Sequence, residues 1–213
     1  MRSPLPARLV RLLVGLVLFG AAEGLMITAG VGVGPWTVFA QGVSRLTGAG
    51  VGWLTVVIGF AVLLLWIPLR QRPGVGTVLN VLVVGTVIEA VVDLVPAPHA
   101  LAVRVPLFAV GLVLLAVASG IYLGAGLGAG PRDGLMTGLH ARVGLPIWSA
   151  RALVELSVLA VGWVLGGNVG VGTVAFALGV GPLVGFFLPR LAPRRAAVPV
   201  PAPVASRACP SSS

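Results

Sequence analysis

Charged residues are scarce in this chain of 213 residues: they make up 9% of it, and the mean hydropathy is +1.10. A soluble domain usually carries about 25% charged residues, so this chain could not cover a water-facing surface. All fourteen basic residues are arginine, and they lie mostly between or beside long apolar runs. This distribution excludes a nucleic-acid-binding protein and predicts an all-α membrane protein whose main partner is the lipid bilayer.

Cysteine and catalytic motifs are also scarce. Cys209 is the only cysteine, which excludes a disulfide framework and a cysteine-based metal site. His99 and His140 lack the spacing of zinc ligands. A nucleophile elbow, a phosphate-binding loop and a metalloprotease motif are all missing. We therefore expect no enzyme, no cofactor and no metal.

Apolar runs long enough to span a membrane are present about six times. Each predicted span has 19 to 21 residues, and about 20 residues cross a bilayer as a helix. The predicted spans are residues 9–29, 51–69, 75–95, 104–123, 147–165 and 171–189. The first run could also be a signal peptide, but the repeat described below pairs it with the fourth span and favours its retention.

The arginines predict the orientation. If the N-terminus is cytoplasmic, twelve of the fourteen arginines fall on the cytoplasmic side, and only Arg45 and Arg104 fall outside. Both termini are then cytoplasmic. Residues 191–213 are rich in Pro, Ala, Ser and Arg without periodicity, which predicts a disordered cytoplasmic tail.

The chain repeats itself at an offset of 96 residues. Residues 30–35 match residues 126–131, and residues 74–78 match residues 170–174 without a gap. The two repeats are residues 1–95 and 96–190, with three predicted spans each. An odd number of spans inverts the second repeat relative to the first. Inverted repeats are a recurrent plan of transporters, although a duplication can also simply enlarge a small membrane protein.

Each repeat contains a short helix that begins with Gly-Pro, at Gly34-Pro35 and at Gly130-Pro131. Proline is favoured at the first helical position, and the positive end of such a helix suits an anionic group. Two of these helix starts could face each other across a site. Their apolar stripes equally indicate helices that lie in the membrane interface. We favour the interfacial alternative and keep the re-entrant one open.

Ionisable side chains within membrane spans are costly, so each is a candidate functional residue. Arg151 and Glu155 are one helical turn apart and can pair. Either they neutralise each other, or Glu155 carries a proton or a cation. Glu23 and Glu89 both fall in the outer half of their spans and could converge on one cation or proton path. Because none of these acids has an acidic counterpart in the other repeat, any site is asymmetric.

The run Gly126–Gly138 (GLGAGPRDGLMTG), then Arg151 and Glu155, and then Gly170–Val174 (GVGTV) resemble the YitT/YczE-type family of bacterial integral membrane proteins. The resemblance covers about residues 10–190. It implies a multi-pass protein of the bacterial plasma membrane, in a largely uncharacterised family without an established activity. In that family an acid often follows Gly-Pro-Trp. Thr37 stands there in this chain, whereas Asp133 keeps the acid in the second repeat.

These observations predict a permease for a small molecule or an ion, with its site between the repeats. The predicted substrate-binding residues are Asp133, Arg132, Arg151, Glu155, Glu23 and Glu89. The predicted structural motif consists of Gly34, Pro35, Gly130, Pro131, Gly74, Gly76, Gly170 and Gly172. Two alternatives remain: a substrate-binding subunit of an ATP-driven importer, and a membrane scaffold or assembly factor. A homo-oligomer and a partner subunit are both compatible with the sequence.

Overall fold

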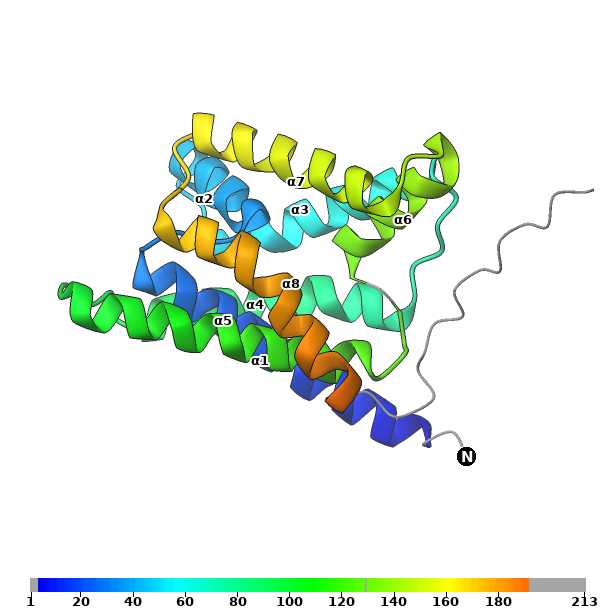
Figure 1. The fold of residues 1–213 in the computed structure, drawn as a ribbon, viewed down its shortest axis with the longest axis horizontal. Coiled ribbons are helices and arrows are strands. Elements are labelled where there is room, and N and C mark those ends of the chain that lie inside the picture. The colour runs from blue at the N-terminus through cyan, green and yellow to red at the C-terminus, as the bar shows by residue number, and fades with distance from the viewer. Residues whose placement is uncertain (1–3, 129, 192–213) are drawn as a thin grey trace, which may run out of the picture.

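The computed structural model describes residues 4–128 and 130–191, and every regular element in these residues is an α-helix (Figure 1). The helices are α1 (Leu5–Ala29), α2 (Pro35–Thr47), α3 (Val51–Leu65), α4 (Val75–Leu94), α5 (Leu101–Leu123), α6 (Pro131–Val143), α7 (Ile147–Val164) and α8 (Val171–Leu191). The prediction of an all-α protein is thereby confirmed. The predicted tail lies outside the described residues, except for Leu191 at the end of α8.

The helix boundaries follow the offset of 96 found in the sequence. Each helix of the first half begins 96 residues before its counterpart in the second: α1 before α5, α2 before α6, α3 before α7 and α4 before α8. The two short helices, α2 and α6, also have the same length of 13 residues. The two repeats therefore consist of the same series of four helices.

Glycines at matching positions give the two halves the same backbone turns. After α1, Gly30 and Gly32 have φ angles of +64° and +121°; after α5, Gly126 and Gly128 have +62° and +137°. Residues with a side chain rarely adopt these angles. The glycine-rich motifs are thus needed for the turn that leads from a long helix into a short Gly-Pro helix.

Four helices are long and apolar enough to cross a membrane: α1, α4, α5 and α8. A fifth span results if α2 and α3, which are bent by 114° relative to each other, are counted as one. α3 has only 15 residues, because the chain leaves the helix after Leu65 and continues in turns as far as Arg70. The structure thus has four or five candidate spans among its described residues, and the count of six stays a prediction.

The central helix of the fold is α1, which packs against both α5 and α4 (Figure 1). It is the most buried of the four candidate spans, with Leu16, Ala22 and Met26 fully inside. α8 is the least buried and exposes large apolar side chains such as Leu178 and Phe186. In a lipid environment, exposed apolar surface of this kind is favourable.

The short helix α2 is largely inside the protein. Trp36, Thr37, Val38 and Ala40 are buried, and the helix packs against α7 and α3. An interfacial helix would leave its polar face in water and its apolar face in lipid. The burial of α2 therefore favours the re-entrant alternative over the interfacial helix that its amphipathic pattern led us to expect.

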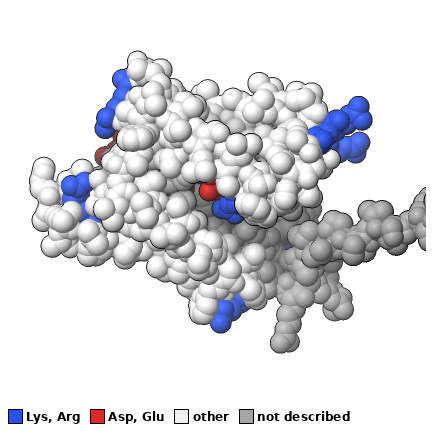
Figure 2. All heavy atoms as spheres, turned by 45° about the horizontal axis from the view of Figure 1, so that its top comes forward, with Lys and Arg blue, Asp and Glu red and all other residues white. Residues whose placement is uncertain are grey.

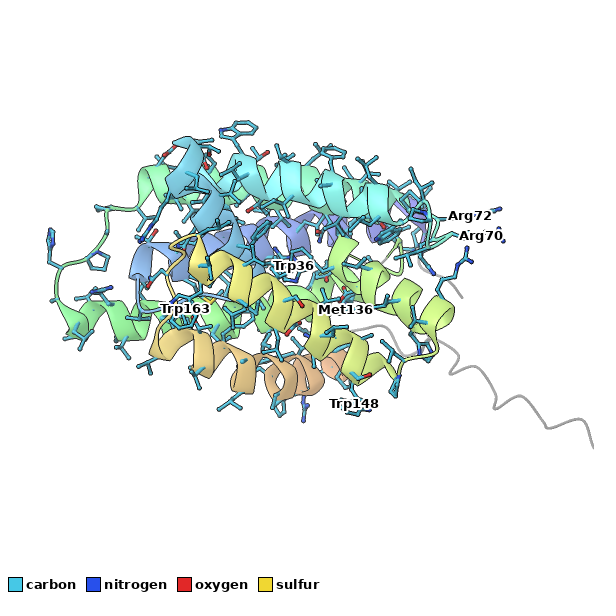
Figure 3. All side chains as sticks on the ribbon, turned by 90° about the horizontal axis from the view of Figure 1, so that it is seen from above. Trp36, Arg70, Arg72, Met136, Trp148 and Trp163 are labelled. Atoms are coloured by element: carbon cyan, nitrogen blue, oxygen red, sulfur yellow. The ribbon has the colours of Figure 1, made fainter. Side chains whose placement is uncertain are left out.

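The two short helices lie toward opposite ends of the longest axis of the molecule (Figure 1). The beginning of α1 and the end of α8 both lie toward the same end as α6. Arg70 and Arg72 extend from that end as well (Figure 3). One end of the molecule thus has α6, both described chain ends and exposed arginines, and the other end has α2.

Candidate functional site

A cavity of about 270 Å³ lies between the two halves of the protein. Gly34 and Pro35 at the start of α2 and Gly130 and Pro131 at the start of α6 all line it. Figure 3 shows Trp36 and Met136, which follow these helix starts and also line the cavity, among the long helices. The structure therefore brings together the two Gly-Pro helix starts that the sequence singled out.

Each glycine-rich loop is held by the opposite half. The backbone N–H of Gly172 donates a hydrogen bond of 2.8 Å to the carbonyl of Val31, and Gly76 donates one of 3.0 Å to Leu127. A Cβ atom at the neighbouring Gly170 would lie 2.5 Å from the Val31 carbonyl oxygen. Only glycine permits an approach this close. The Gly-x-Gly motifs at the starts of α4 and α8 are thus docking points for the loops, outside the cavity lining.

Gly74 has the same role as Gly170. A Cβ atom at Gly74 would lie 2.6 Å from the carbonyl oxygen of Leu127. The four glycines of these motifs therefore shape the site indirectly, because they fix the loops that lead into α2 and α6.

A matched pair of arginines also links the two halves of the protein. The Nε of Arg104 in α5 donates a hydrogen bond of 2.7 Å to the carbonyl of Ala29, and its Nη2 donates to Gly30. The Nε of Arg8 in α1 donates one of 2.9 Å to Ala125, and its Nη2 donates one of 2.7 Å to Gly126. The last carbonyls of a helix lack partners within it, and a cation is favourable there. Each half thus caps the first helix of the other half, α1 or α5.

Arg151 and Glu155 form the ion pair that their spacing predicts. The Nε of Arg151 donates a hydrogen bond of 3.0 Å to Oε1 of Glu155, on the cavity side of α7. Their side chains are 52% and 30% exposed. Both residues therefore line the cavity where it reaches the surface of the protein.

Arg132 and Asp133 line the cavity from the first turn of α6. The guanidinium carbon of Arg132 lies 5.3 Å from the centre of the Trp36 ring, which is within the range of a cation–π contact. Burial raises the pKa of the Asp133 carboxyl above its usual range, and Glu155 acts in the same direction. Arg151, Arg132 and a backbone hydrogen bond at Gly130 oppose that rise in pKa.

Glu23 is the most deeply buried acid of the cavity, with only 1% of its surface exposed. Its Oε2 accepts a hydrogen bond of 2.7 Å from the hydroxyl of Thr37 in α2. Thr37 occupies the position in the first repeat that Asp133 occupies in the second. The hydroxyl at this position thus supports an acid on another helix instead of supplying one.

Glu89 lies outside the cavity lining and is the one predicted binding residue that the structure does not bring to it. Its Oε2 accepts a hydrogen bond of 2.7 Å from the backbone N–H of Gly52, in the first turn of α3. A carboxylate at the beginning of a helix is favourable because the first N–H groups lack partners there. Glu89 therefore caps α3 and fastens it to α4.

Sequence reasoning missed the aromatic part of the cavity. Phe19, Trp36, Tyr122 and Phe176 line it from four different helices. Trp36 has an additional feature: its buried Nε1 has no hydrogen-bond partner in the part of the chain that the structure describes. The available signal was its place directly after Gly-Pro, where the second repeat has Arg132.

The two halves differ in how the third helix of each packs on the fourth. α3 packs along α4, whereas α7 and its equivalent partner α8 have almost no contact with each other. Residues of α7 and α8 nevertheless line the cavity together. Figure 2 shows an acidic and a basic side chain at a hollow in the middle of the face that is turned forward. The contact between α7 and α8 therefore closes the cavity less than the contact between α3 and α4 does.

Residues 6–189 match the sequence pattern of a family of unknown function, DUF6198. The chain belongs to this family. It is 41% identical over 177 residues to an uncharacterized protein of Haemophilus influenzae, and the matching region covers 83% of this chain and 81% of that protein. It is 31% identical over 193 residues to the uncharacterized membrane protein YczE of Bacillus subtilis, which covers 89% of each.

These relatives confirm the resemblance to YczE-type proteins that the Gly-Pro and Gly-x-Gly motifs indicate. No solved structure matches the chain. Together with its apolar helices, the similarity to YczE shows that this DUF6198 protein is a membrane protein.

Proposed function

We propose that this DUF6198 protein is a permease for a small solute, which binds in the cavity between the two halves. The observation that carries the proposal is the cavity itself, where both Gly-Pro helix starts, charged side chains and aromatic rings meet. Ligand sites are generally concave, largely apolar and equipped with a few polar groups. In transporters built from inverted repeats, the site lies where the repeats meet.

The solute is small. The cavity has a volume of about 270 Å³. This volume is at the lower limit of ligand pockets, which extend from about 300 to 1,000 Å³. It suits an ion with its hydration shell or a metabolite of about the size of an amino acid.

The permease has six crossings, α1, α3, α4, α5, α7 and α8, in two repeats of opposite orientation. The positions of α2 and α6 toward opposite ends of the molecule support this topology (Figure 1). The end with Arg70 and Arg72 faces the cytoplasm, as the positive-inside rule requires (Figure 3). Both termini are then cytoplasmic, and the membrane is the bacterial plasma membrane.

The difference between the repeats supplies the access route. In the described state α3 is packed on α4, and α7 stands away from α8. Because the repeats are equivalent, the same chain can adopt the reverse arrangement, in which α7 closes on α8 and α3 separates from α4. The cavity then opens to the other side of the membrane, and a permease needs this alternating access.

Solute transport by this chain without a partner protein distinguishes a permease from a binding subunit or a scaffold. Gly181 and Gly185 offer a matched pair of positions on α8, because a Cβ atom at either would meet nothing within 4 Å. Only Gly181 lines the cavity. A phenylalanine at Gly181 fills the cavity, and one at Gly185 extends away from the cavity lining.

The test uses membrane vesicles that contain the full chain and a filtered extract of polar metabolites. Mass spectrometry identifies the solutes that enter the vesicles. We expect at least one small solute to accumulate with the native chain and with Gly185→Phe, and at least tenfold less of it with Gly181→Phe. The same uptake by Gly181→Phe, or no solute that depends on the native chain, would contradict a permease with this site.

A further inference from the structure

We infer that the cavity binds a small zwitterion, a molecule that carries one carboxylate and one ammonium group. The transport of that molecule rests on the proposed function, but its binding does not. The inference starts from the charges in the cavity. The pair formed by Arg151 and Glu155 is the only ion pair within the described residues. Arg132, Asp133 and Glu23 therefore line the cavity without an opposite charge within 4 Å.

The negative pole of the cavity is Glu23. It reaches the cavity from α1, and nearly all of its surface is buried. The hydroxyl of Thr37 binds one of its two oxygens, Oε2, and supplies no charge. A buried carboxylate is costly unless a cation or further donors accompany it. An ammonium group in the cavity supplies both.

The positive pole consists of two donors at the beginnings of α2 and α6. Arg132 is the first, with its guanidinium over the Trp36 ring. The second is the indole N–H of Trp36, which is buried and has no acceptor among the described residues. Trp36 is only 7% exposed and lines the cavity. A buried donor without an acceptor is unfavourable, and a carboxylate beside Arg132 can accept from both donors.

Asp133 belongs to neither of the two poles. It lies in the first turn of α6, next to Gly130, where the helix N-terminus favours a negative charge. Its carboxyl oxygen Oδ2 would lie 3.3 Å from a Cβ atom at Gly130, so it stays close to its own helix start. Asp133 thus has a hydrogen bond at Gly130 and the start of its own helix beside it, whereas the described residues of the cavity supply no cation for Glu23 and no acceptor for the indole N–H of Trp36.

A ligand with a single charge satisfies only one pole. A simple organic cation would leave the N–H of Trp36 and the charge of Arg132 without an acceptor. A simple anion would leave Glu23 buried without a cation. Both poles adjoin the first turn of α2, because Thr37 contacts Glu23 and the neighbouring Trp36 contacts Arg132. One small molecule can therefore reach both, and the aromatic rings enclose its apolar part.

The test measures the melting temperature of the full chain in detergent with four additives. These are a mixture of the standard L-amino acids, their amides, the corresponding amines without a carboxylate, and the corresponding acids without an amine. A ligand that binds only the folded state raises the melting temperature. We expect a rise of about 3 °C or more with the amino acids, and less than 1 °C with the other three mixtures.

Matched variants show whether the rise comes from the two poles. Trp36→Phe keeps the ring and removes the N–H, and Trp53→Phe does the same at an exposed position outside the cavity. Glu23→Gln removes the buried charge, and Glu89→Gln makes the same change outside the cavity. We expect the rise to vanish with Trp36→Phe and Glu23→Gln and to persist with Trp53→Phe and Glu89→Gln. Arg132→Gln provides a third test at a partly exposed position.

The outcomes separate the two proposals. A rise with the amides or the amines equal to that with the amino acids would show a cation site, and an equal rise with the acids alone would show an anion site. Either result overturns the zwitterion, and so does a lack of response to all four mixtures. Uptake of another class of solute that Gly181→Phe blocks would then leave the permease intact. A rise specific to amino acids without any uptake would instead retain the zwitterion and overturn the permease.

Discussion

Two arginines that are 96 positions apart bind the ends of the two longest helices. Arg104 donates to two carbonyl oxygens at the end of α1, and Arg8 donates to two just beyond the end of α5. Sequence analysis used both residues only to orient the chain in the membrane. Their contacts show a structural role, because each one satisfies carbonyls that have no partner within their own helix.

Removal of either arginine should therefore destabilise the fold. Hydrogen bonds to charged groups contribute about 1.5–3 kcal/mol, and the bonds of Arg104 are partly buried. We expect Arg104→Ala to lower the free energy of unfolding by about 2 kcal/mol. Arg8→Ala should cost less, about 1 kcal/mol, because one of its bonds is exposed.

Unfolding of the purified chain in detergent by urea or heat measures both effects. The control is Arg142→Ala, which removes an exposed arginine near the end of α6. An equal loss of stability in the control would indicate a general effect of positive charge and would contradict the capping role.

At the scale of whole elements, the position of α2 depends on its contact with α7. The two helices approach so closely that glycines form the contact on both sides. A Cβ atom at Gly42 would lie 2.7 Å from the carbonyl oxygen of Gly162, and one at Gly162 would lie 2.6 Å from the backbone of Phe39. Close packing through small residues is typical of helices in membranes. This contact holds the first turn of α2, and hence Trp36 and Thr37, at the cavity.

A single methyl group at this contact should separate the helices. In Gly162→Ala the neighbouring atoms are backbone and cannot turn aside, so we expect a loss of about 1–3 kcal/mol, as for other overpacked cores. Gly185→Ala makes the same change in a helix at a position without any atom within 4 Å. Its stability should stay equal or rise slightly, because alanine favours a helix over glycine.

The melting temperatures of the two variants in detergent test this close contact between α2 and α7. Ligand binding offers a second measurement, because displacement of α2 moves Trp36 as well. If Gly162→Ala melts at the same temperature as Gly185→Ala, α2 and α7 do not approach each other as described.

At the scale of the whole molecule, the proposal depends on the opposite orientation of the two repeats. Thr47 ends α2 and Val143 ends α6, at equivalent positions 96 residues apart. Both side chains are exposed. They report directly on the side of the membrane that each short helix occupies.

Single cysteines at these two positions, in a Cys209→Ser chain, should therefore react differently with an impermeant maleimide. In intact cells we expect Thr47→Cys to be labelled and Val143→Cys to be protected until the membrane is broken. Labelling after lysis controls for the reactivity of each site. If both cysteines are labelled in intact cells, or both are protected, the repeats have the same orientation and the proposed exchange of access between them is contradicted.

Most of the helical series could be predicted from the sequence, because its signals are local. Proline at a first helical position and glycine at positive φ act within one turn of the chain. The predicted starts near residues 35, 75, 131 and 171 therefore agree with the structure. The second span was predicted to end at residue 69, whereas α3 ends at Leu65, because the apolar run continues past Leu65 and hydropathy alone does not mark the turn that follows.

The candidate site was predictable in part. The Gly-Pro helix starts and the pair of Arg151 and Glu155 follow from spacing, and the structure places all of them at one cavity. Glu23 and Glu89 looked alike in the sequence because both are acids in the outer half of an apolar helix. Only the packing of the helices separates them, since one carboxylate reaches the cavity and the other caps α3.

The sequence by itself determined the membrane environment, the duplication and the helix starts. These depend on composition and on short-range backbone geometry, which neighbouring helices do not alter. The tertiary structure alone decided which side chains share the cavity, that α2 is buried, and that each half caps the other through Arg8 and Arg104. These features depend on how each helix is rotated and how closely it approaches its neighbours. That is a property of the packed molecule, in which contacts far apart in the sequence must be satisfied together.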